Sequence, residues 1–331
     1  MRYVNLGRTG LKVSTLCLGT MNFLKLDADE EQGTSIIHAA VDAGINFIDT
    51  ADCYGESELI VGRALADRRD KVVLATKCWA PWSKWPNEGG SSRYHIMAAA
   101  ERSLKRLQTD HIDLLLIHRP DWQWPQTPTE EMLGAFTDLV RQGKVRYIGS
   151  SCYPAWKLVE AQLTSQLHGM ERFCCEQLNY SITNRLPEND ILHLCEKYGI
   201  GVTVYSPLQD GWLTGKYRRG AEPPADSRMA RKFRLRANDP NAEKYYDIVE
   251  KLVPLCEKLS VPMSQLSLAW LLQNPLVHSV ILGPRTLEQF QDNLKSLDVT
   301  LDAETLAAID QINPPGNAVY AEYPPIRSWR K

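Results

Sequence analysis

The chain of 331 residues is 44% hydrophobic and 24% charged, which are ordinary globular proportions that exclude a disordered or fibrous protein. Its 38 basic and 40 acidic residues give a formal net charge of −2, and no basic run indicates nucleic acid or a membrane surface, so we expect a small-molecule partner. The eight cysteines lack CxxC spacing and the density of a stapled secreted domain, so we expect reduced thiols and predict no metal site.

The N-terminal residues predict a hairpin and no targeting segment. The start, MRYVNLGRTG, contains no apolar signal region, and no stretch approaches the roughly 18 apolar residues that cross a bilayer. We therefore expect a cytoplasmic protein without a membrane segment. The hairpin is predicted over residues 3–14, with Gly7 and Gly10 at its turn.

After the hairpin, short apolar runs alternate with helical patterns. Most of the runs are continuously apolar or β-branched, which is typical of parallel strands covered on both faces. The predicted strands are residues 15–19, 45–48, 71–76, 113–117, 145–149, 173–178, 201–205 and 278–282. Strand–helix units that repeat in this way predict an α/β fold: a (β/α)8 TIM barrel, as a single domain over residues 1–331.

One helical segment, residues 127–144, carries start and stop signals. Thr127 is expected to cap the helix, Pro128 to occupy its first position and Glu130 to complete a capping box, while Gly143 ends it. Two connections are unusually long, residues 77–93 and 209–241. Both follow strand C-termini, the face where barrel enzymes keep their sites, so we interpret them as lids or pocket walls.

Titratable side chains end three consecutive predicted strands. Asp49 follows the second barrel strand, Lys77 the third and His118 the fourth, and Tyr54 stands in the loop after Asp49. A barrel inclines these strand ends toward a common centre, so the four side chains are predicted to converge. Taken alone, each has an ordinary structural explanation: a helix cap for Asp49, a solvated charge for Lys77, a turn for His118 and loop packing for Tyr54.

Together the four side chains describe a general acid directed at a carbonyl group. The pKa of an unperturbed tyrosine is near 10, and an adjacent ammonium stabilises the phenolate. Lys77 is the available cation, Asp49 can pair with it, and His118 can orient a substrate oxygen. Asp52 is interpreted as a cap.

The motifs INFIDTADCYGESE, LATK, LLLIHRPD and YSPLQDGWLTGKY closely resemble the aldo-keto reductase superfamily. The branch that they resemble includes bacterial reductases and voltage-gated potassium channel β subunits. The similarity runs in register from residue 3 to residue 312. It implies a (β/α)8 barrel and hydride transfer from a nicotinamide cofactor to an aldehyde or ketone. The family's tetrad falls on Asp49, Tyr54 as proton donor, Lys77 and His118.

The cofactor is expected to bind without a dinucleotide-binding fingerprint, because no GxGxxG follows any predicted strand. The segment ILGPRTLEQFQDN instead offers a glycine, an arginine and a helix N-terminus, which suit phosphate. The resemblance assigns adenosine and phosphate contacts to Gly283, Arg285, Gln289 and Asn293, although Gln289 fits a capping box with Thr286 equally well. An arginine suits a 2′-phosphate, so NADP(H) is preferred and NAD(H) is the alternative.

The resemblance also assigns residues to the nicotinamide and pyrophosphate. These are Gly19, Thr20, Met21, Asp49, Ser151, Gln177, Tyr205, Ser206, Leu208, Gly211, Leu213, Gly215 and Lys216. For Tyr205, which would stack on the nicotinamide, core packing is an equally good explanation. Two positions depart from the family pattern: Cys152 replaces the usual asparagine, and Asp292 replaces a common glutamate.

Tryptophans on the loops beside Lys77 and His118 suggest a substrate pocket. Trp79, Trp82 and Trp122 would line it together with Tyr54 and His118, and loop anchoring is the alternative interpretation. Flat indoles suit an aromatic or sugar-derived carbonyl or alcohol. The substrate itself and the oligomeric state, including a homo-oligomer, stay open.

Two alternative functions remain. One is an NADP-binding regulatory subunit like the channel β subunits, although no inactivation-type extension precedes the hairpin. The other is an NAD-linked sugar or alcohol dehydrogenase working in the oxidative direction.

Overall fold

The computed structural model describes residues 1–23, 29–121, 126–230 and 241–319. The chain divides into two compact units. The first comprises Met1–Leu178, Leu194–Val204 and Leu276–Gln291. The second comprises Asn179–His193, Tyr205–Pro275 and Asp292–Lys331.

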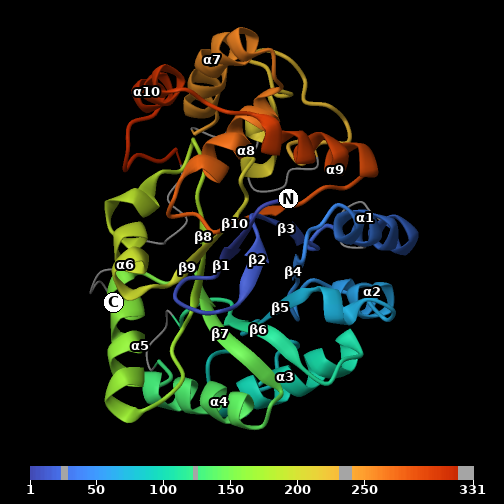
Figure 1. Cartoon of the computed structure of the whole chain (residues 1–331), viewed down its shortest axis with the longest axis vertical. Coiled ribbons are helices and arrows are strands. Elements are labelled where there is room, and N and C mark those ends of the chain that lie inside the picture. The colour runs from blue at the N-terminus through green and yellow to red at the C-terminus, as the bar shows by residue number, and fades with distance from the viewer. Residues whose placement is uncertain (24–28, 122–125, 231–240, 320–331) are drawn as a thin grey trace. The chain divides into compact units, whose positions relative to one another are not determined.

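A closed barrel of parallel strands forms the centre of the first unit, in the order β10-β3-β4-β5-β6-β7-β8-β9 (Figure 1). The strands are β3 (Leu16–Gly19), β4 (Phe47–Asp49), β5 (Val73–Cys78), β6 (Ile112–Ile117), β7 (Val145–Ser151), β8 (Cys175–Asn179), β9 (Gly201–Tyr205) and β10 (Ser279–Leu282). Each overlaps one predicted strand, and the predicted (β/α)8 barrel is confirmed. Because both faces of these strands are covered, their residues are almost all buried.

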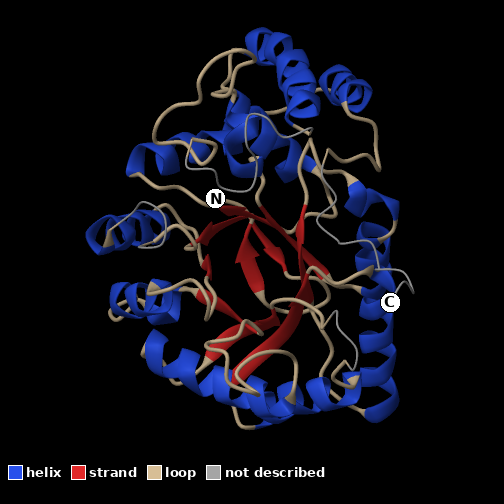
Figure 2. Cartoon of the chain, turned by 180° about the vertical axis from the view of Figure 1, so that it is seen from behind, coloured by secondary structure: helices blue, strands red, loops and turns tan. Residues whose placement is uncertain are grey.

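Helices of the first unit lie outside the ring of strands, as the opposite views of Figures 1 and 2 show. They are α1 (Glu30–Asp42), α2 (Ser57–Ala64), α3 (Arg93–Leu107), α4 (Thr129–Arg141) and α5 (Ala155–His168), with the 3-10 turn η1 (Arg69–Lys71). Capping matches local sequence: Asp29 accepts a hydrogen bond from the Gln32 amide, and Ser92 accepts one from the His95 amide.

The predicted start of α4 is wrong by one residue, and the predicted capping box is not formed. Pro128 is extended and occupies the N-cap position, so the helix begins at Thr129 without a side-chain cap. The Thr127 amide instead donates to Asp121 Oδ2 at 3.4 Å, which keeps this residue in the preceding turn. The predicted end is correct, because Gly143 adopts φ +73°, a conformation that glycine takes without steric cost.

The predicted hairpin pairs β1 (Tyr3–Asn5) with β2 (Lys12–Ser14), and Val4 faces Val13 in the antiparallel register. Gly7 turns the chain at φ +56°, and a Cβ there would collide with the Gly199 carbonyl oxygen. The residue therefore has to be glycine.

The second unit is mainly helical in its described residues. It contains η2 (Leu186–Asn189), η3 (Gln209–Thr214), α7 (Ala242–Leu259), α8 (Met263–Gln273), η4 (Lys295–Asp298) and α10 (Ala303–Ile312). Two further helices, α6 (Ile191–Tyr198) and α9 (Leu287–Leu294), have residues in both units. Trp212 stacks on Tyr245 with ring centroids 4.7 Å apart, an aromatic core for η3 and α7. No helix in the described part of the chain is both long and apolar enough to cross a membrane.

The approach of α2 to α3 predicts opposite effects for two helical glycines. A Cβ on Gly62 would lie 2.7 Å from the backbone carbonyl of Leu107, whereas a Cβ on Gly134 in α4 would meet nothing within 4 Å. Gly62→Ala should lower the free energy of unfolding by about 1–3 kcal/mol, because the two helices must separate. Gly134→Ala should raise it by up to about 1 kcal/mol. Urea denaturation measures both, and equal stabilities would contradict the close approach.

Candidate active site

The predicted strand ends do meet at one rim of the barrel. Asp49 is the last residue of β4 and pairs with Ala75 in the register, while Lys77 in β5 pairs with Leu116 in β6. His118 directly follows β6 and its amide bonds to the Cys78 carbonyl at 2.9 Å. The strands therefore carry these residues to neighbouring positions. β4 ends one residue later than its predicted strand and β5 ends two residues later, so Asp49 and Lys77 belong to the strands themselves.

A buried ion pair lies at the centre of the site. Lys77 is fully buried, and its Nζ donates to Asp49 Oδ1 at 2.5 Å and to the Thr50 carbonyl at 2.9 Å. The other carboxylate oxygen, Asp49 Oδ2, accepts from Gln177 Nε2 at 2.9 Å. Burial alone would lower the pKa of Lys77, but the Asp49 charge, the Tyr54 hydroxyl and the hydrogen bond raise it above its ordinary value. These contacts favour the charged form of Lys77.

Tyr54 and His118 lie beside this pair. The ammonium of Lys77 is 5.0 Å from the centroid of the Tyr54 ring, and the Tyr54 and His118 rings meet edge to face at 5.7 Å. Asp49, Tyr54, Lys77 and His118 thus converge as the sequence predicts. Burial raises the pKa of Tyr54 to about 12, and the charge and hydrogen bond of Lys77 oppose that shift. Lys77 therefore stabilises the phenolate in the predicted direction, but burial has the larger effect on the pKa of Tyr54.

A cluster of hydroxyl groups contacts the backbone of Asp49, and of its members only Thr20 was predicted from the sequence as a site residue. Thr20 donates both its amide and its Oγ1 to the Asp49 carbonyl at 3.0 Å. Ser57 Oγ lies 2.6 Å from Thr20 Oγ1 and 3.0 Å from Thr50 Oγ1, so it joins three segments. Its place at the start of α2, close to Tyr54 in sequence, was the available signal.

The ends of β7 and β8 bring Ser151 and Gln177 together. Ser151 Oγ donates to the Gln177 carbonyl at 2.9 Å, and the Cys152 amide donates to the same oxygen at 3.0 Å. Cys152 adopts φ +59°, a left-handed conformation that asparagine takes more readily than cysteine. The departure from the family's asparagine therefore carries a backbone cost of about 1–2 kcal/mol as well as a weaker polar group.

Some polar groups of the predicted phosphate-binding segment are already used in hydrogen bonds that cap α9. Thr286 Oγ1 accepts from the Gln289 amide at 3.2 Å, and Gln289 Oε1 accepts from the Arg285 amide at 2.9 Å, which is the capping interpretation of Gln289. Gly283 is open, since an added Cβ would approach only Asn22 Nδ2, at 3.3 Å. Asn22 was not predicted; its Nδ2 donates to the Gly283 carbonyl at 2.7 Å and joins this segment to the loop after β3.

The remaining residues assigned to the cofactor belong to the second unit. They are Tyr205, Ser206, Leu208, Gly211, Leu213, Gly215, Lys216 and Asn293. Positive φ values recur in this loop, at Ser206, Gln209 and Asp210 as well as at its glycines. Such conformations are costly for side-chain-bearing residues and are concentrated at functional sites. Asp292, the other departure, accepts hydrogen bonds from Gln265 and Ser264 within the same unit.

Comparison of the sequence with known proteins identifies the family of this chain. Residues 15–314 match the model of the aldo/keto reductase family. The chain belongs to the aldo/keto reductase family. It is 41% identical to "Uncharacterized oxidoreductase YrpG" of Bacillus subtilis (strain 168), over 99% of this chain and 100% of that protein. It is 38% identical to "Probable voltage-gated potassium channel subunit beta" of Arabidopsis thaliana, over 90% of this chain and 92% of that protein.

A "Putative voltage-gated potassium channel subunit beta" of Schizosaccharomyces pombe (strain 972 / ATCC 24843) is 36% identical, over 93% of this chain and 92% of that protein. The predicted family and branch are confirmed. Membership of the aldo/keto reductase family supports oxidoreductase chemistry on small molecules with a nicotinamide cofactor.

In this aldo/keto reductase, the tryptophans of the loop after β5 are anchored by carboxylates. Trp79 Nε1 donates to Asp121 Oδ1 at 2.8 Å, and Trp82 Nε1 donates to Asp52 Oδ2 at 3.4 Å. Trp79 also has φ +142°, a strained backbone that the surrounding loop must hold. These contacts favour the anchoring interpretation for the indole edges and leave pocket lining by their faces as a prediction. Trp122 lies outside the described residues.

A buried carboxyl group beside the site predicts a dependence of stability on pH. Burial raises the pKa of Glu176 to about 8, against the hydrogen bonds from Ser150 Oγ and the Tyr153 amide. The folded protein therefore keeps a proton that the unfolded chain loses from pH 4.5 upward. Below pH 4.5 the group does not lower the free energy of unfolding. Between pH 4.5 and about 8 the free energy of unfolding falls by up to about 1.4 kcal/mol per pH unit.

Glu176→Gln should flatten this decline, because glutamine fills the same space without titrating. Urea denaturation of both proteins across that pH range measures the difference, with the exposed Glu130→Gln as the matched control. Parallel stability curves for the wild type and Glu176→Gln would show that Glu176 is ionised when folded.

Proposed function

We propose that this protein reduces an aldehyde or ketone to the alcohol with NADPH, and that Tyr54 is the general acid. The observation that carries the proposal is the buried Lys77–Asp49 pair, with Tyr54 and His118 beside it. A cation that is fixed next to a phenol stabilises the phenolate left behind when the proton departs. No other role explains as directly why a lysine is buried completely at this rim.

The residues divide the reaction between them. The bound cofactor would supply the hydride. Tyr54 donates its proton to the carbonyl oxygen as the carbon accepts the hydride, which completes the alcohol, and the phenolate regains a proton from solvent. A pKa of about 12 keeps Tyr54 protonated at neutral pH, so the acid is ready before the substrate binds. His118 donates a hydrogen bond that orients the carbonyl, and Asp49 with Gln177 holds Lys77 in place.

The residues of the first unit fit a nicotinamide dinucleotide. Gly283 leaves the backbone open ahead of α9, and Arg285 stands just before that helix, where its guanidinium suits phosphate. We assign Gly19, Thr20, Met21, Asp49, Ser151 and Gln177 to the nicotinamide side. Gln289 is retained only as a cap that positions Arg285. For the residues of the second unit, the family resemblance supports the assignment.

A regulatory function is the second candidate, because two relatives are named as potassium channel β subunits at 38% and 36% identity. It would combine tight NADP binding with negligible turnover of carbonyl compounds. An NAD-linked dehydrogenase that oxidises an alcohol would use the same residues with the proton moving in reverse. A screen of NADPH oxidation over aromatic aldehydes, dicarbonyls, sugars and pyridoxal separates these functions.

Replacement of the acid tests the mechanism. Tyr54→Phe should lower kcat/KM by about 100-fold to 10,000-fold, since the phenolic proton is lost while the ring remains. The Kd for NADPH, measured by fluorescence titration, should change little. The exposed Tyr94→Phe is the matched control and should keep wild-type kinetics. Substantial carbonyl reduction by Tyr54→Phe would remove the assignment of Tyr54.

Replacement of the arginine tests the cofactor preference. Arg285→Ala should weaken NADPH binding by about 10-fold to 100-fold, because a charge-assisted hydrogen bond to the 2′-phosphate is worth about 1.5–3 kcal/mol. NADH, which lacks this phosphate, should lose much less affinity. Arg285→Lys should fall between, because it keeps the charge but not the planar fork. Equal losses for NADPH and NADH, measured by titration, would contradict a 2′-phosphate contact.

A further inference from the structure

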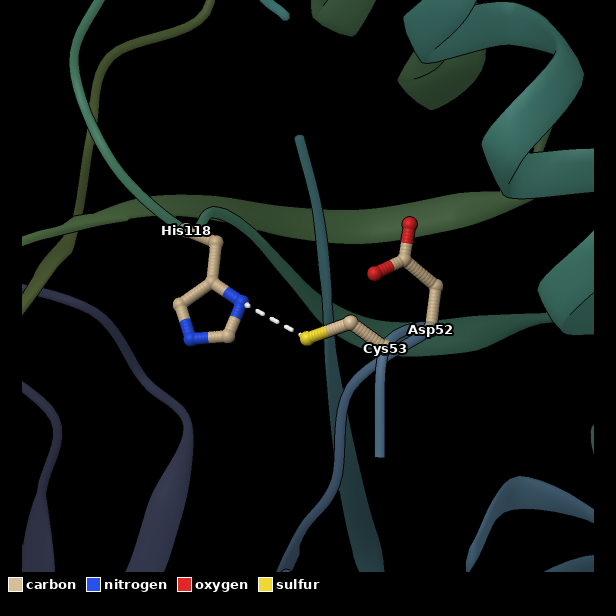
Figure 3. Close-up of side chains that lie close together, drawn as sticks. All are labelled: Asp52, Cys53 and His118. Atoms are coloured by element: carbon tan, nitrogen blue, oxygen red, sulfur yellow. Dashed lines mark hydrogen bonds between the residues drawn. The ribbon is translucent and has the colours of Figure 1, made fainter. Parts of the chain in front are cut away.

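A second group of side chains, beside the proposed acid, has the composition of a metal site. Asp52 and Cys53 come from the loop after β4, and His118 follows β6; Figure 3 shows the three side chains turned toward one another. One ligand atom from each lies within 4.8 Å of the others. Among the residues that the structure describes, no other group of three histidine, cysteine or acidic side chains meets this criterion.

The distance between the two soft ligands fits zinc. Zn–S and Zn–N bonds of about 2.3 Å and 2.0–2.1 Å at a tetrahedral angle place sulfur and nitrogen about 3.6 Å apart. Cys53 Sγ and His118 Nδ1 are 3.6 Å apart. A hydrogen bond between thiol and imidazole explains the same distance, so a further observation is needed to indicate a cation.

Asp52 provides that observation. Its side chain is 5% exposed, and in the described structure Oδ1 is buried without a hydrogen-bond partner. The other oxygen, Oδ2, accepts the long 3.4 Å bond from Trp82 Nε1 that is described above. A buried carboxylate oxygen that makes no hydrogen bond costs free energy, and a coordinated cation would remove that cost.

We propose that Asp52, Cys53 and His118 bind Zn²⁺ or another thiophilic divalent cation. A thiolate, an imidazole and a carboxylate are three protein ligands that zinc accepts, with water at the fourth position. Magnesium and calcium, which prefer oxygen ligands, do not suit the sulfur. On binding, the thiol proton leaves to solvent and Sγ bonds the metal. The loop that carries Tyr54 is then tied to the end of β6.

The site has a consequence for catalysis, and this consequence alone rests on the proposed function. The carbonyl oxygen has to reach both Tyr54 and His118, whose rings are 5.7 Å apart at their centroids. A cation with its water ligand on His118 occupies part of that space. Zn²⁺ therefore competes with the carbonyl substrate and raises its KM.

Cobalt(II) is the probe, because it replaces zinc at such sites and shows thiolate charge-transfer absorption, whereas zinc has no such spectrum. We expect one Co²⁺ per chain, the thiolate band in the near ultraviolet, and loss of the band when Zn²⁺ is added. Cys53→Ser should lose the band, and Asp52→Asn should weaken binding at least about 10-fold. The control is Cys256→Ser, which should keep the band, since Cys53 and Cys256 are the two cysteines that are not fully buried.

The outcomes separate this proposal from the proposed function. A wild-type protein without a thiolate band, or Cys53→Ser with an unchanged band and native circular dichroism, overturns the site. If Cys53→Ser does not fold, the Kd of folded Asp52→Asn for Co²⁺ decides: a rise of at least about 10-fold supports the site, and an unchanged Kd overturns it. Zn²⁺ that binds but leaves KM for the carbonyl unchanged overturns the competition. If no carbonyl is reduced at all, the cobalt measurements still decide whether the cation binds.

Discussion

The candidate site depends on one buried ion pair, between Lys77 and Asp49. Burying two charges costs several kcal/mol of desolvation per ion, which their attraction offsets only when the remaining polar atoms are also satisfied. Here Lys77 also donates to the Thr50 carbonyl, and Gln177 occupies the second oxygen of Asp49. The pair is thus held by residues of β4, β5 and β8, three strands that the closed barrel fixes relative to one another. A rigid barrel can therefore bury the charged Lys77, because the partners of the ion pair are held in fixed positions.

The ion pair decides how Tyr54 can act. Burial raises the pKa of the phenol, and the neighbouring ammonium lowers it, so the group stays protonated while its conjugate base has a fixed counter-charge. Burial matters before the proton transfer, and the charge of Lys77 matters after it. Before the transfer Tyr54 is protonated, and after it the phenolate lies beside Lys77 without any rearrangement of the protein. Preorganised charge of this kind is the commonest large contribution to catalysis.

The sequence was sufficient for the barrel and for the four converging residues, because parallel strands end at one rim and their polar ends are visible as breaks in apolar runs. It was not sufficient for contacts that closure of the barrel creates between distant segments, such as Asn22 with Gly283 or Gln177 with Asp49. Local signals also misled where tertiary contacts compete with them. Thr127 reads as a helix cap, but its amide binds Asp121, so the helix begins without that cap.

The contact between Cys53 and His118 links the two proposals through the tautomer of the imidazole. For His118 to donate to a carbonyl from Nε2 while neutral, Nδ1 must be an acceptor, so the Cys53 thiol has to donate to it across their 3.6 Å contact. A cation bound at Nδ1 would also leave the proton on Nε2, but it would need Cys53 as a thiolate, and it would oppose the substrate only through the space that its water ligand takes. Cys53, the residue before Tyr54, therefore determines which nitrogen of His118 carries the proton, whether or not a metal is bound. At position 53, a side chain that has no proton to donate could fill the same space as cysteine. It would not favour the His118 tautomer that carries its proton on Nε2.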